Sequence, residues 1–307
     1  MAIRFRVCMA LLGALCLLAS SPSRADVLEE ELYVENSWGV AEDSLDVSAL
    51  PSPLYGKLKQ VVEAGVLRVS MEPYYAPQEF IDPSLEGQAS FVGSDVELAK
   101  RIAERMGVEL EIVPMEFTKV LEAVKDGTVD LAISALSYTP GRASSVLFSK
   151  GYHSSAEEAG SCLIIRAEDE GVICGVEDLV GRDIVAQSGS LQELLLAERV
   201  PSYHQYVRVP SVMDVYAFLR SGKADASMGD IQVTQSYIEH NPDCGLLALT
   251  DTPFVLPPEF DGDRVAAKKG ALQLMAFVNG VIDEVLEEDL YEKWFEEYDL
   301  YAKRLGY

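Results

Sequence analysis

Residues 133–142 read ISALSYTPGR, and this stretch indicates how the chain folds. An apolar run that includes Val129, Leu131 and Ile133 ends here, as expected for a buried strand. The Ser-Tyr-Thr-Pro-Gly sequence that follows favours a turn, because proline and glycine interrupt strands. Arg142 therefore stands just beyond the carboxyl end of a strand, where a guanidinium can clamp a carboxylate. A solvated loop arginine is the alternative interpretation.

Strands and helices alternate on both sides of this stretch. The expected strands lie at residues 66–69, 108–112, 129–133, 183–186, 204–209, 224–228 and 246–249. Helices are expected between them, and residues 271–298 are mostly helical. Ser94 and Glu97 have the spacing of a capping box, which predicts a helix start at Ser94. The alternation predicts βα units and largely parallel sheets.

A short internal repeat predicts two lobes. Residues 125–130 read KDGTVD and residues 220–225 read RSGKAD. Each is a helix end, a glycine cap and a strand with an early acid, although chance similarity is the alternative for so short a match. Ligands bind beyond the carboxyl ends of such strands. Facing lobes would therefore place Arg142 on one wall of a cleft and Asp230 on the other.

A cation and a carboxylate on facing walls suit a zwitterionic ligand. Arg142 can bind a carboxylate with two parallel hydrogen bonds. Asp230 can accept hydrogen bonds from an ammonium, or it can cap the helix that begins after it. Further orienting donors are expected from the hydroxyls of Ser134, Ser137 and Ser190 and from the backbone N–H groups around Gly189. The ligand's side chain is expected to contact Glu72, Tyr75 and Phe117, unless the two aromatic residues belong to the core.

The charge of the chain limits the classes of partner. Its 307 residues carry 50 acidic side chains against 25 lysines and arginines, a formal net charge of −25. Nucleic acid and anionic membrane surfaces would repel such a chain, so we expect neither as a partner. The length suffices for two medium-sized domains with sizeable cores.

No residue pattern indicates catalysis or metal binding. Cys162 and Cys174 could close a disulfide loop or remain unpaired, and the cysteine spacing fits no zinc motif. His153, His204 and His240 stand beside no obvious partner. We therefore expect no catalytic residue, no metal and no cofactor.

The N-terminal segment is expected to be absent from the mature protein. Two arginines precede an apolar run over residues 7–19, and Ser23 and Ala25 are small residues at the positions that a signal peptidase reads. A cleaved signal peptide over residues 1–25 predicts a periplasmic protein. An uncleaved anchor is the alternative, although the run is short for a full membrane span.

Residues 26–54 form an acidic leader ahead of the fold. Its first part, residues 26–46, contains eight acids and no base. This composition predicts a solvated and poorly ordered segment. A docking arm for a partner is the alternative interpretation.

Four stretches, in their order and spacing, resemble the periplasmic amino-acid-binding proteins, the solute receptors of bacterial uptake transporters of the ATP-binding-cassette (ABC) type. They are residues 67–77 (LRVSMEPYYAP), 93–99 (GSDVELA), 130–142 (DLAISALSYTPGR) and 293–295 (KWF). The resemblance covers residues 66–295. It implies an α/β periplasmic-binding-protein fold of two lobes, each a mostly parallel sheet flanked by helices, with a hinge between the lobes.

The resemblance also implies a role for individual residues. Arg142 would hold the α-carboxylate of an amino acid and Asp230 its α-ammonium. The assisting groups would be Ser137 and the backbone at Ala135, and the side-chain contacts would be Glu72 and Tyr75. Two positions depart from the family pattern. Ala135 replaces a usual hydroxyl or glycine, and Leu191 replaces a usual threonine, so that only its N–H remains as a donor.

The expected protein is a monomeric, non-catalytic receptor that passes a polar or cationic amino acid to the membrane permease of an ABC transporter. One lobe is expected over residues 55–156 and 256–307 and the other over 157–255, with crossings near residues 153–161 and 251–259. A cyclohexadienyl or arogenate dehydratase on the same fold is one alternative, with Glu72 as the general acid. A partner-binding module that has lost transport is another.

Overall fold

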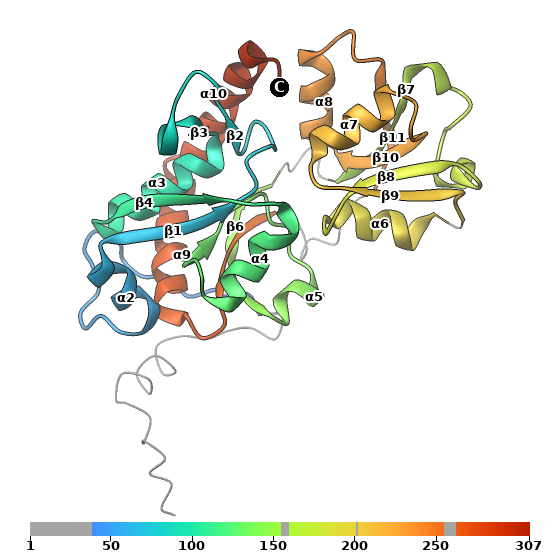
Figure 1. Ribbon diagram of the computed structural model, residues 1–307. Helices are drawn as coiled ribbons and strands as arrows, with labels where there is room; N and C mark the ends of the chain where they lie inside the picture. Colours follow the sequence, from blue (N-terminus) through green and yellow to red (C-terminus); the bar gives the residue numbers. More distant parts are fainter. Residues whose placement is uncertain (1–38, 155–159, 201, 255–261) are drawn as a thin grey trace, which may run out of the picture.

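The computed structural model describes residues 39–154, 160–200, 202–254 and 262–307. Over these residues the chain forms two lobes, each built on a five-stranded sheet (Figure 1). The expected signal peptide and residues 26–38 of the acidic leader lie outside the described residues. The predicted limits of the lobes, at residues 156/157 and 255/256, also lie outside the described residues, so they stay a prediction. No helix in the described part of the chain is long and apolar enough to cross a membrane.

The first sheet has the strand order β4-β1-β5-β12-β6. Its strands are β1 (Val66–Met71), β4 (Glu109–Pro114), β5 (Leu131–Ala132), β6 (Val146–His153) and β12 (Asp263–Lys268). β1 is parallel to β4 and β5, whereas β12 is antiparallel to both of its neighbours. Four of the five strands therefore run in one direction, as a mostly parallel sheet requires.

The second sheet has the equivalent order, β9-β8-β10-β7-β11. Its strands are β7 (Ser161–Arg166), β8 (Asp183–Gln187), β9 (Gln205–Val209), β10 (Ala226–Asp230) and β11 (Leu246–Phe254). Here β7 is the antiparallel strand. In each lobe, the strand of opposite direction is the one that follows a passage of the chain from the other lobe. The sequence did not predict β6, β7 or β12.

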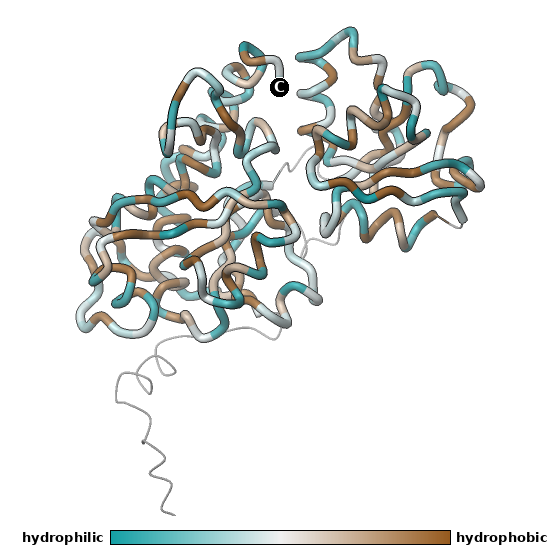
Figure 2. The backbone as a smooth tube through the Cα atoms, in the orientation of Figure 1, coloured by the Kyte–Doolittle hydropathy of each residue, from teal (hydrophilic) through white to brown (hydrophobic). Residues whose placement is uncertain are grey.

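Helices cover both faces of each sheet (Figure 1). One face of the first sheet packs on α2 (Gly56–Ala64), α3 (Ser94–Met106), α9 (Leu272–Glu287) and α10 (Leu290–Leu305), and the other on α4 (Phe117–Asp126) and α5 (Pro140–Ala143). The second sheet packs on α6 (Leu191–Arg199) and, across it, on α7 (Val212–Arg220) and α8 (Ile231–His240). Figure 2 shows the resulting pattern, with apolar strands inside and hydrophilic segments outside. The remaining elements are β2 (Phe80–Ile81), β3 (Phe91–Val92) and 3₁₀ helices at Gly87–Ser90, Ala167–Asp169 and Val176–Leu179.

The internal repeat has the same structural role in both lobes. Asp130 Oδ2 accepts a hydrogen bond from the Arg68 N–H (2.8 Å) in β1. Asp225 Oδ2 accepts one from the Asp183 N–H (2.9 Å) in β8. Each acid thus holds the first parallel strand of its own lobe, which confirms that the two stretches are equivalent.

The predicted capping box at the start of α3 is wrong. The residue before the helix is Gly93, with φ at 130°, and the Ser94 hydroxyl donates to the Tyr291 hydroxyl (3.1 Å) instead. A Cβ at Gly93 would lie 2.1 Å from the carbonyl oxygen of Gln78. A close approach between two backbone segments therefore decides where α3 begins.

The second half of the acidic leader is ordered, contrary to expectation. Ala41 is fully buried, and its N–H donates to the carbonyl of Phe148 (2.8 Å) in β6. The Leu45 N–H donates to the carbonyl of Ala276 (3.0 Å) in α9. The acids suggested disorder, but the backbone of residues 39–54 binds the first lobe while acidic side chains point outward.

Polar contacts join α10 of the first lobe to α8 of the second. Asp299 accepts a hydrogen bond from the Ser236 hydroxyl, and its Oδ2 lies 3.3 Å from His240 Nε2. Asn241 Nδ2 donates to the carbonyl of Tyr307 (3.3 Å). The lobes are therefore in direct contact near the C-terminus (Figure 1).

Candidate functional site

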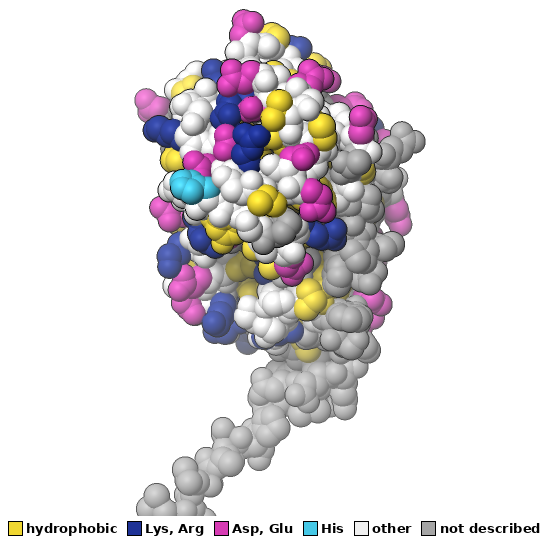
Figure 3. Space-filling view, turned by 90° about the vertical axis from the view of Figure 1, so that its right-hand side faces the viewer, with side chains coloured by type: hydrophobic (Ala, Val, Ile, Leu, Met, Phe, Trp, Pro, Cys, Tyr) yellow, Lys and Arg dark blue, Asp and Glu magenta, His cyan; other side chains and the backbone are white. Residues whose placement is uncertain are grey.

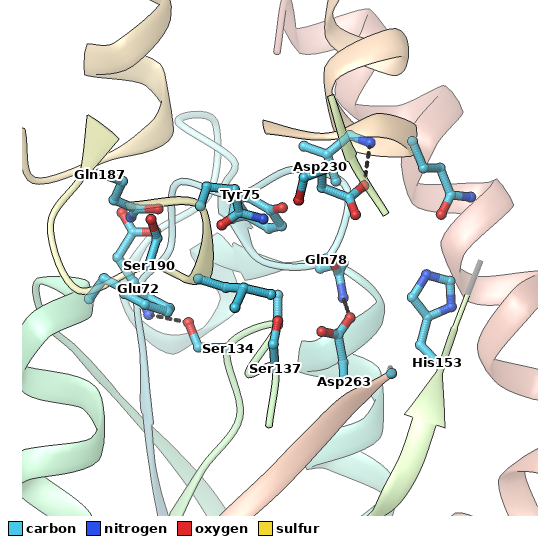
Figure 4. A pocket seen from close by; sticks show the side chains of 18 of the residues that line it. Glu72, Tyr75, Gln78, Ser134, Ser137, His153, Gln187, Ser190, Asp230 and Asp263 are labelled. Carbon is cyan, nitrogen blue, oxygen red and sulfur yellow. Dashed lines mark hydrogen bonds between the residues drawn. The ribbon is translucent and has the colours of Figure 1, made fainter. Parts of the chain in front are cut away.

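A pocket lies between the two lobes, and its empty space, with the open solvent at its mouth included, is about 860 Å³ (Figure 4). The loops after β1 and β5 bound it on one side, and the segments after β8 and β10 bound it on the other. The carboxyl ends of parallel strands from both sheets thus face one space, as is usual for ligand sites in open α/β sheets. The predicted site residues that line it are Glu72, Tyr75, Phe117, Ser134, Ala135, Ser137, Arg142, Ser190, Leu191 and Asp230.

Arg142 is the only lysine or arginine among the described residues that line this pocket. Its guanidinium donates to the carbonyls of Ser137 (2.7 Å) and, across the lobes, Gly189 (2.8 Å). It also lies over the Phe117 ring, 5.5 Å from the centroid. Burial lowers the pKa of Arg142 to about 10, so the group remains charged at neutral pH. No carboxylate in the described part of the chain forms an ion pair with it. The guanidinium therefore lines the pocket with a positive charge that no acidic side chain among the described residues neutralises.

The turn before α6 differs from its predicted role. Ser190 caps the helix, because its Oγ accepts the Glu193 N–H (2.9 Å). The Gly189 N–H donates to Glu193 Oε2 (2.6 Å), so it does not orient a ligand as expected, and Gly189 itself does not line the pocket. The N–H of Leu191 lies in the first turn of α6, where backbone N–H groups have no intrahelical partner.

Asp230 stands where β10 meets α8. Its Oδ1 accepts the Val233 N–H (3.1 Å), so it caps the helix, as the alternative interpretation predicted. The same residue lines the pocket, and Figure 4 shows it across the pocket from Ser137. Helix capping orients the carboxylate toward the space between the lobes.

Glu72 provides an acidic end to the pocket, beside Gln187 (Figure 4). Its side chain is 2% exposed, and no lysine or arginine in the described residues pairs with it. Burial raises the pKa of Glu72 to about 7, against hydrogen bonds from Gln187 and the Tyr74 backbone that lower it. The Ser134 hydroxyl accepts the Glu72 N–H (3.1 Å) and donates to Glu79 (2.8 Å), so its hydrogen is already engaged.

A buried network beneath the pocket holds Ala135. Asp95 accepts hydrogen bonds from the Ala135 N–H (2.9 Å) and from the hydroxyls of Tyr152 (2.9 Å) and Tyr291 (2.6 Å). The Ala135 N–H is therefore engaged within the protein, so that the assisting role implied for the Ala135 backbone stays a prediction for its carbonyl. The residue has φ at 45°, in the left-handed region that favours glycine. Burial raises the pKa values of both Asp95 and Glu79.

The two aromatic residues face the pocket, and both are half-buried. Phe117 begins α4, packs partly on the core and supports Arg142 with its ring. Tyr75 follows β1 and lies between the Glu72 end of the pocket and the end at Asp263 (Figure 4). Both positions allow contact with a ligand.

Several pocket residues were missed by the sequence reasoning, among them Gln78, His153 and Asp263. Gln78 Nε2 donates to Asp263 Oδ2 (2.9 Å), and His153 Nδ1 lies 3.0 Å from Glu292 Oε1. Burial raises the pKa of Asp263 to about 7. Burial alone would lower the pKa of His153, but the bond to Glu292 and the Asp263 charge raise it overall. No local motif marks these residues, because His153 ends β6 and Asp263 begins β12. Gln187 was also missed, although its place at a strand end was a usable signal.

Comparisons with known proteins agree on one family. Residues 67–298 match the bacterial extracellular solute-binding proteins, family 3. The arginine-binding extracellular protein ArtP of Bacillus subtilis is 30% identical over 67% of this chain and 78% of its own length. The L-cystine-binding protein TcyJ of Escherichia coli is 28% identical over 78% of this chain and 86% of its own.

A solved structure agrees with the sequence relatives. It is the amino acid ABC transporter substrate-binding protein AbpA from Streptococcus pneumoniae, bound to L-arginine. It matches with a TM-score of 0.70 and 32% identity, covering 78% of this chain and 97% of that chain. All three proteins are named for binding, and none of the three for catalysis.

Proposed function

Because the chain belongs to the bacterial extracellular solute-binding proteins of family 3, we propose that it binds a polar or cationic α-amino acid between its lobes. Arg142 is the observation that carries this proposal. It is a charged group that lines the pocket without an ion-pair partner in the described chain. A charge in a partly buried site without a partner costs free energy, and a ligand carboxylate would supply that partner.

The α-carboxylate is assigned to Arg142 and the start of α6. The carbonyls of Ser137 and Gly189 hold the guanidinium in one orientation. The Leu191 N–H belongs to the positive end of α6, which favours an anion. Two hydrogen bonds from Arg142 and one from this N–H would satisfy the carboxylate without the threonine hydroxyl that the family usually has.

The α-ammonium is assigned to Asp230. This carboxylate comes from the second lobe, whereas Arg142 comes from the first. A zwitterion would therefore contact both lobes at once and favour their approach around the ligand, as in other two-lobed receptors.

The ligand's side chain is assigned to Glu72, Tyr75 and Phe117. Glu72 is buried and lacks a basic partner among the described residues, which favours a cationic side chain over a neutral one. The names of the arginine-binding relative and of the arginine-bound structure support the same choice. The cystine-binding relative supports a polar ligand.

Export and transport complete the proposal. The signal sequence at residues 1–25 would deliver the protein to the periplasm, where it would pass its ligand to an ABC permease as a monomer. Figure 3 shows acidic side chains spread over the end of the second lobe with basic ones among them, and the net charge of −25 disfavours nucleic acid. A dehydratase is less well supported, because the relatives are named as binding proteins.

Thermal unfolding with a panel of amino acids tests this function. We expect L-arginine or another cationic amino acid to raise the Tm of the mature protein more than glutamine, and glutamate to raise it least. A ligand at 100 times its Kd stabilises the folded state by about 2.7 kcal/mol. If no amino acid raises the Tm, or if glutamate is the best ligand, the proposed function is wrong.

Replacing Glu72 with glutamine should weaken binding of a cationic amino acid by roughly 10- to 100-fold, because a charged hydrogen bond contributes about 1.5–3 kcal/mol. The pKa of about 7 adds a pH signature. A bound cation favours the ionised carboxylate, so the affinity of the native protein should rise as the pH increases through 7. In the glutamine variant this part of the rise should disappear. Calorimetric titrations between pH 6 and 8 measure both effects.

Glu111→Gln is the matched control, because Glu111 on β4 forms an exposed ion pair with Arg68 on β1, outside the pocket. We expect its affinity and pH profile to equal those of the native protein. Equal losses in the two variants would show that Glu72 acts only through overall charge, contrary to its assignment.

A further inference from the structure

Asp263 lies where the chain returns to the first lobe, and it faces the pocket (Figure 4). It is the first residue of β12, pairs in register with His153 of β6 and forms an isolated bridge with Ser137. Gln78 Nε2 donates to its Oδ2 (2.9 Å). Strand pairing and this hydrogen bond therefore hold the carboxylate in place.

The charge of Asp263 has no lysine or arginine within ion-pair distance in the described chain. The titratable and charged side chains that act on it or that it acts on are Tyr75, Glu79, Asp95, Arg142, Tyr152, His153, Asp230 and Tyr291. Burial raises the pKa of Asp263 to about 7, and the nearby charges of Asp95 and Asp230 raise it too, while His153 lowers it. A cation in the pocket would relieve this concentration of negative charge.

The position of the ligand's ammonium follows from that of its carboxylate. Both groups are bonded to one carbon, through bonds of about 1.5 Å. A ligand held by Arg142 must therefore place its ammonium close to that guanidinium. Asp263 forms its bridge with Ser137, the residue whose carbonyl accepts a hydrogen bond from Arg142, and Asp230 lines the same pocket from the second lobe. Both carboxylates therefore face the pocket in which a ligand held by Arg142 would place its ammonium.

Few side chains of the first lobe can accept a hydrogen bond from an ammonium at this point. Ala135 has no hydroxyl, so that only its backbone carbonyl could accept. The Ser134 hydroxyl is engaged with Glu79, and the Ser137 carbonyl with Arg142. We propose that Asp263 is the first lobe's acceptor for the α-ammonium, so that Asp263 and Asp230 hold this group from opposite lobes. This inference rests on the amino-acid binding proposed above.

Two consequences follow from this arrangement. The ammonium contacts both lobes next to the first residue of β12, in addition to the contacts that the carboxylate makes with both lobes. Binding also requires ionised Asp263, which is about half protonated at pH 7 when its pKa is about 7. Ligand capture should therefore release a proton from this residue.

Asp263→Asn tests the inference with two probes, L-arginine and 5-guanidinopentanoate, which lacks only the α-ammonium. By calorimetry we expect the variant to bind L-arginine roughly 10- to 100-fold more weakly than the native protein. Its affinity for 5-guanidinopentanoate should be nearly unchanged. Titrations at pH 7 in buffers of different ionisation enthalpy should show proton release by the native protein and less release by the variant. If another amino acid in the panel binds more tightly, that amino acid and its des-amino acid replace the two probes.

Asp126→Asn, which changes an exposed acid at the end of α4, is the matched control and should behave as the native protein. An unchanged affinity of Asp263→Asn for L-arginine would overturn the inference while leaving the proposed function intact. So would an equal loss for both probes, because it would indicate a structural role for Asp263. A native protein that binds no amino acid would overturn the proposed function itself, and the inference with it.

Discussion

Replacing Arg142 with alanine should weaken amino-acid binding by roughly 100-fold or more. Removing one partner of a buried ion pair costs about 3–5 kcal/mol, and each 1.4 kcal/mol is a factor of ten in affinity. The variant also loses the hydrogen bond to the Gly189 carbonyl, which joins the lobes. Isothermal titration with the best ligand of the panel measures the loss. The Tm without ligand should change little, because Arg142 forms no ion pair within the described chain.

Arg68→Ala is the matched control, since Arg68 pairs with Glu111 at the exposed surface of the first sheet. Such pairs contribute at most about 1 kcal/mol to stability, and this one does not reach the pocket.

Arg142→Lys distinguishes the effect of the charge from that of the hydrogen-bond geometry. Lysine keeps the charge but cannot form the paired hydrogen bonds, so we expect intermediate affinity. Native affinity in Arg142→Ala would exclude Arg142 as the carboxylate site.

Replacing Gly93 with alanine should destabilise the first lobe by roughly 3 kcal/mol or more. The backbone at Gly93 has φ at 130°, which other residues rarely adopt, and a Cβ there would lie 2.1 Å from the Gln78 carbonyl oxygen. That carbonyl also accepts the Asp95 N–H (2.9 Å). The added methyl group should therefore displace the loop that carries Gln78 and Glu79. Thermal unfolding and ligand titration should show a lower Tm together with weaker binding.

Gly175→Ala provides the comparison. Gly175 has φ at −169°, and a Cβ there would have no neighbour within 4 Å. We expect its stability to stay within about 0.5 kcal/mol of the native protein, as for most surface substitutions. A Gly93→Ala variant as stable as Gly175→Ala would show that the contact between α3 and the Gln78 loop relaxes freely.

Much of the fold could be predicted because its signals are local. Asp130 and Asp225 follow a helix end and a glycine in the same pattern, and each binds the first strand of its lobe. Arg142 follows a strand and a Pro-Gly turn, so its place at a strand end could be read directly. Helices and strands of the regular βα units agree with the expected ranges within a few residues, because their apolar periodicity is strong.

The parts that were missed depend on contacts between distant segments. β12 enters the first sheet antiparallel between β5 and β6, and no feature of residues 263–268 indicates these neighbours. The polar group of Gln78, His153 and Asp263 exists only because this strand and β6 meet beside the loop after β1. The leader was misjudged for the same reason, since the carbonyls that bind it belong to Phe148 and Ala276.

The sequence by itself determined the two-lobed α/β fold, the family and the facing positions of Arg142 and Asp230, because strand ends and turns are set by neighbouring residues. Only the tertiary structure decided which polar groups remain available to a ligand. It engages the N–H groups of Ala135 and Gly189, and it brings Asp263 to the pocket. Hydrogen bonding is decided by distance and angle in space, and residues far apart in the chain become partners only once the sheets have formed.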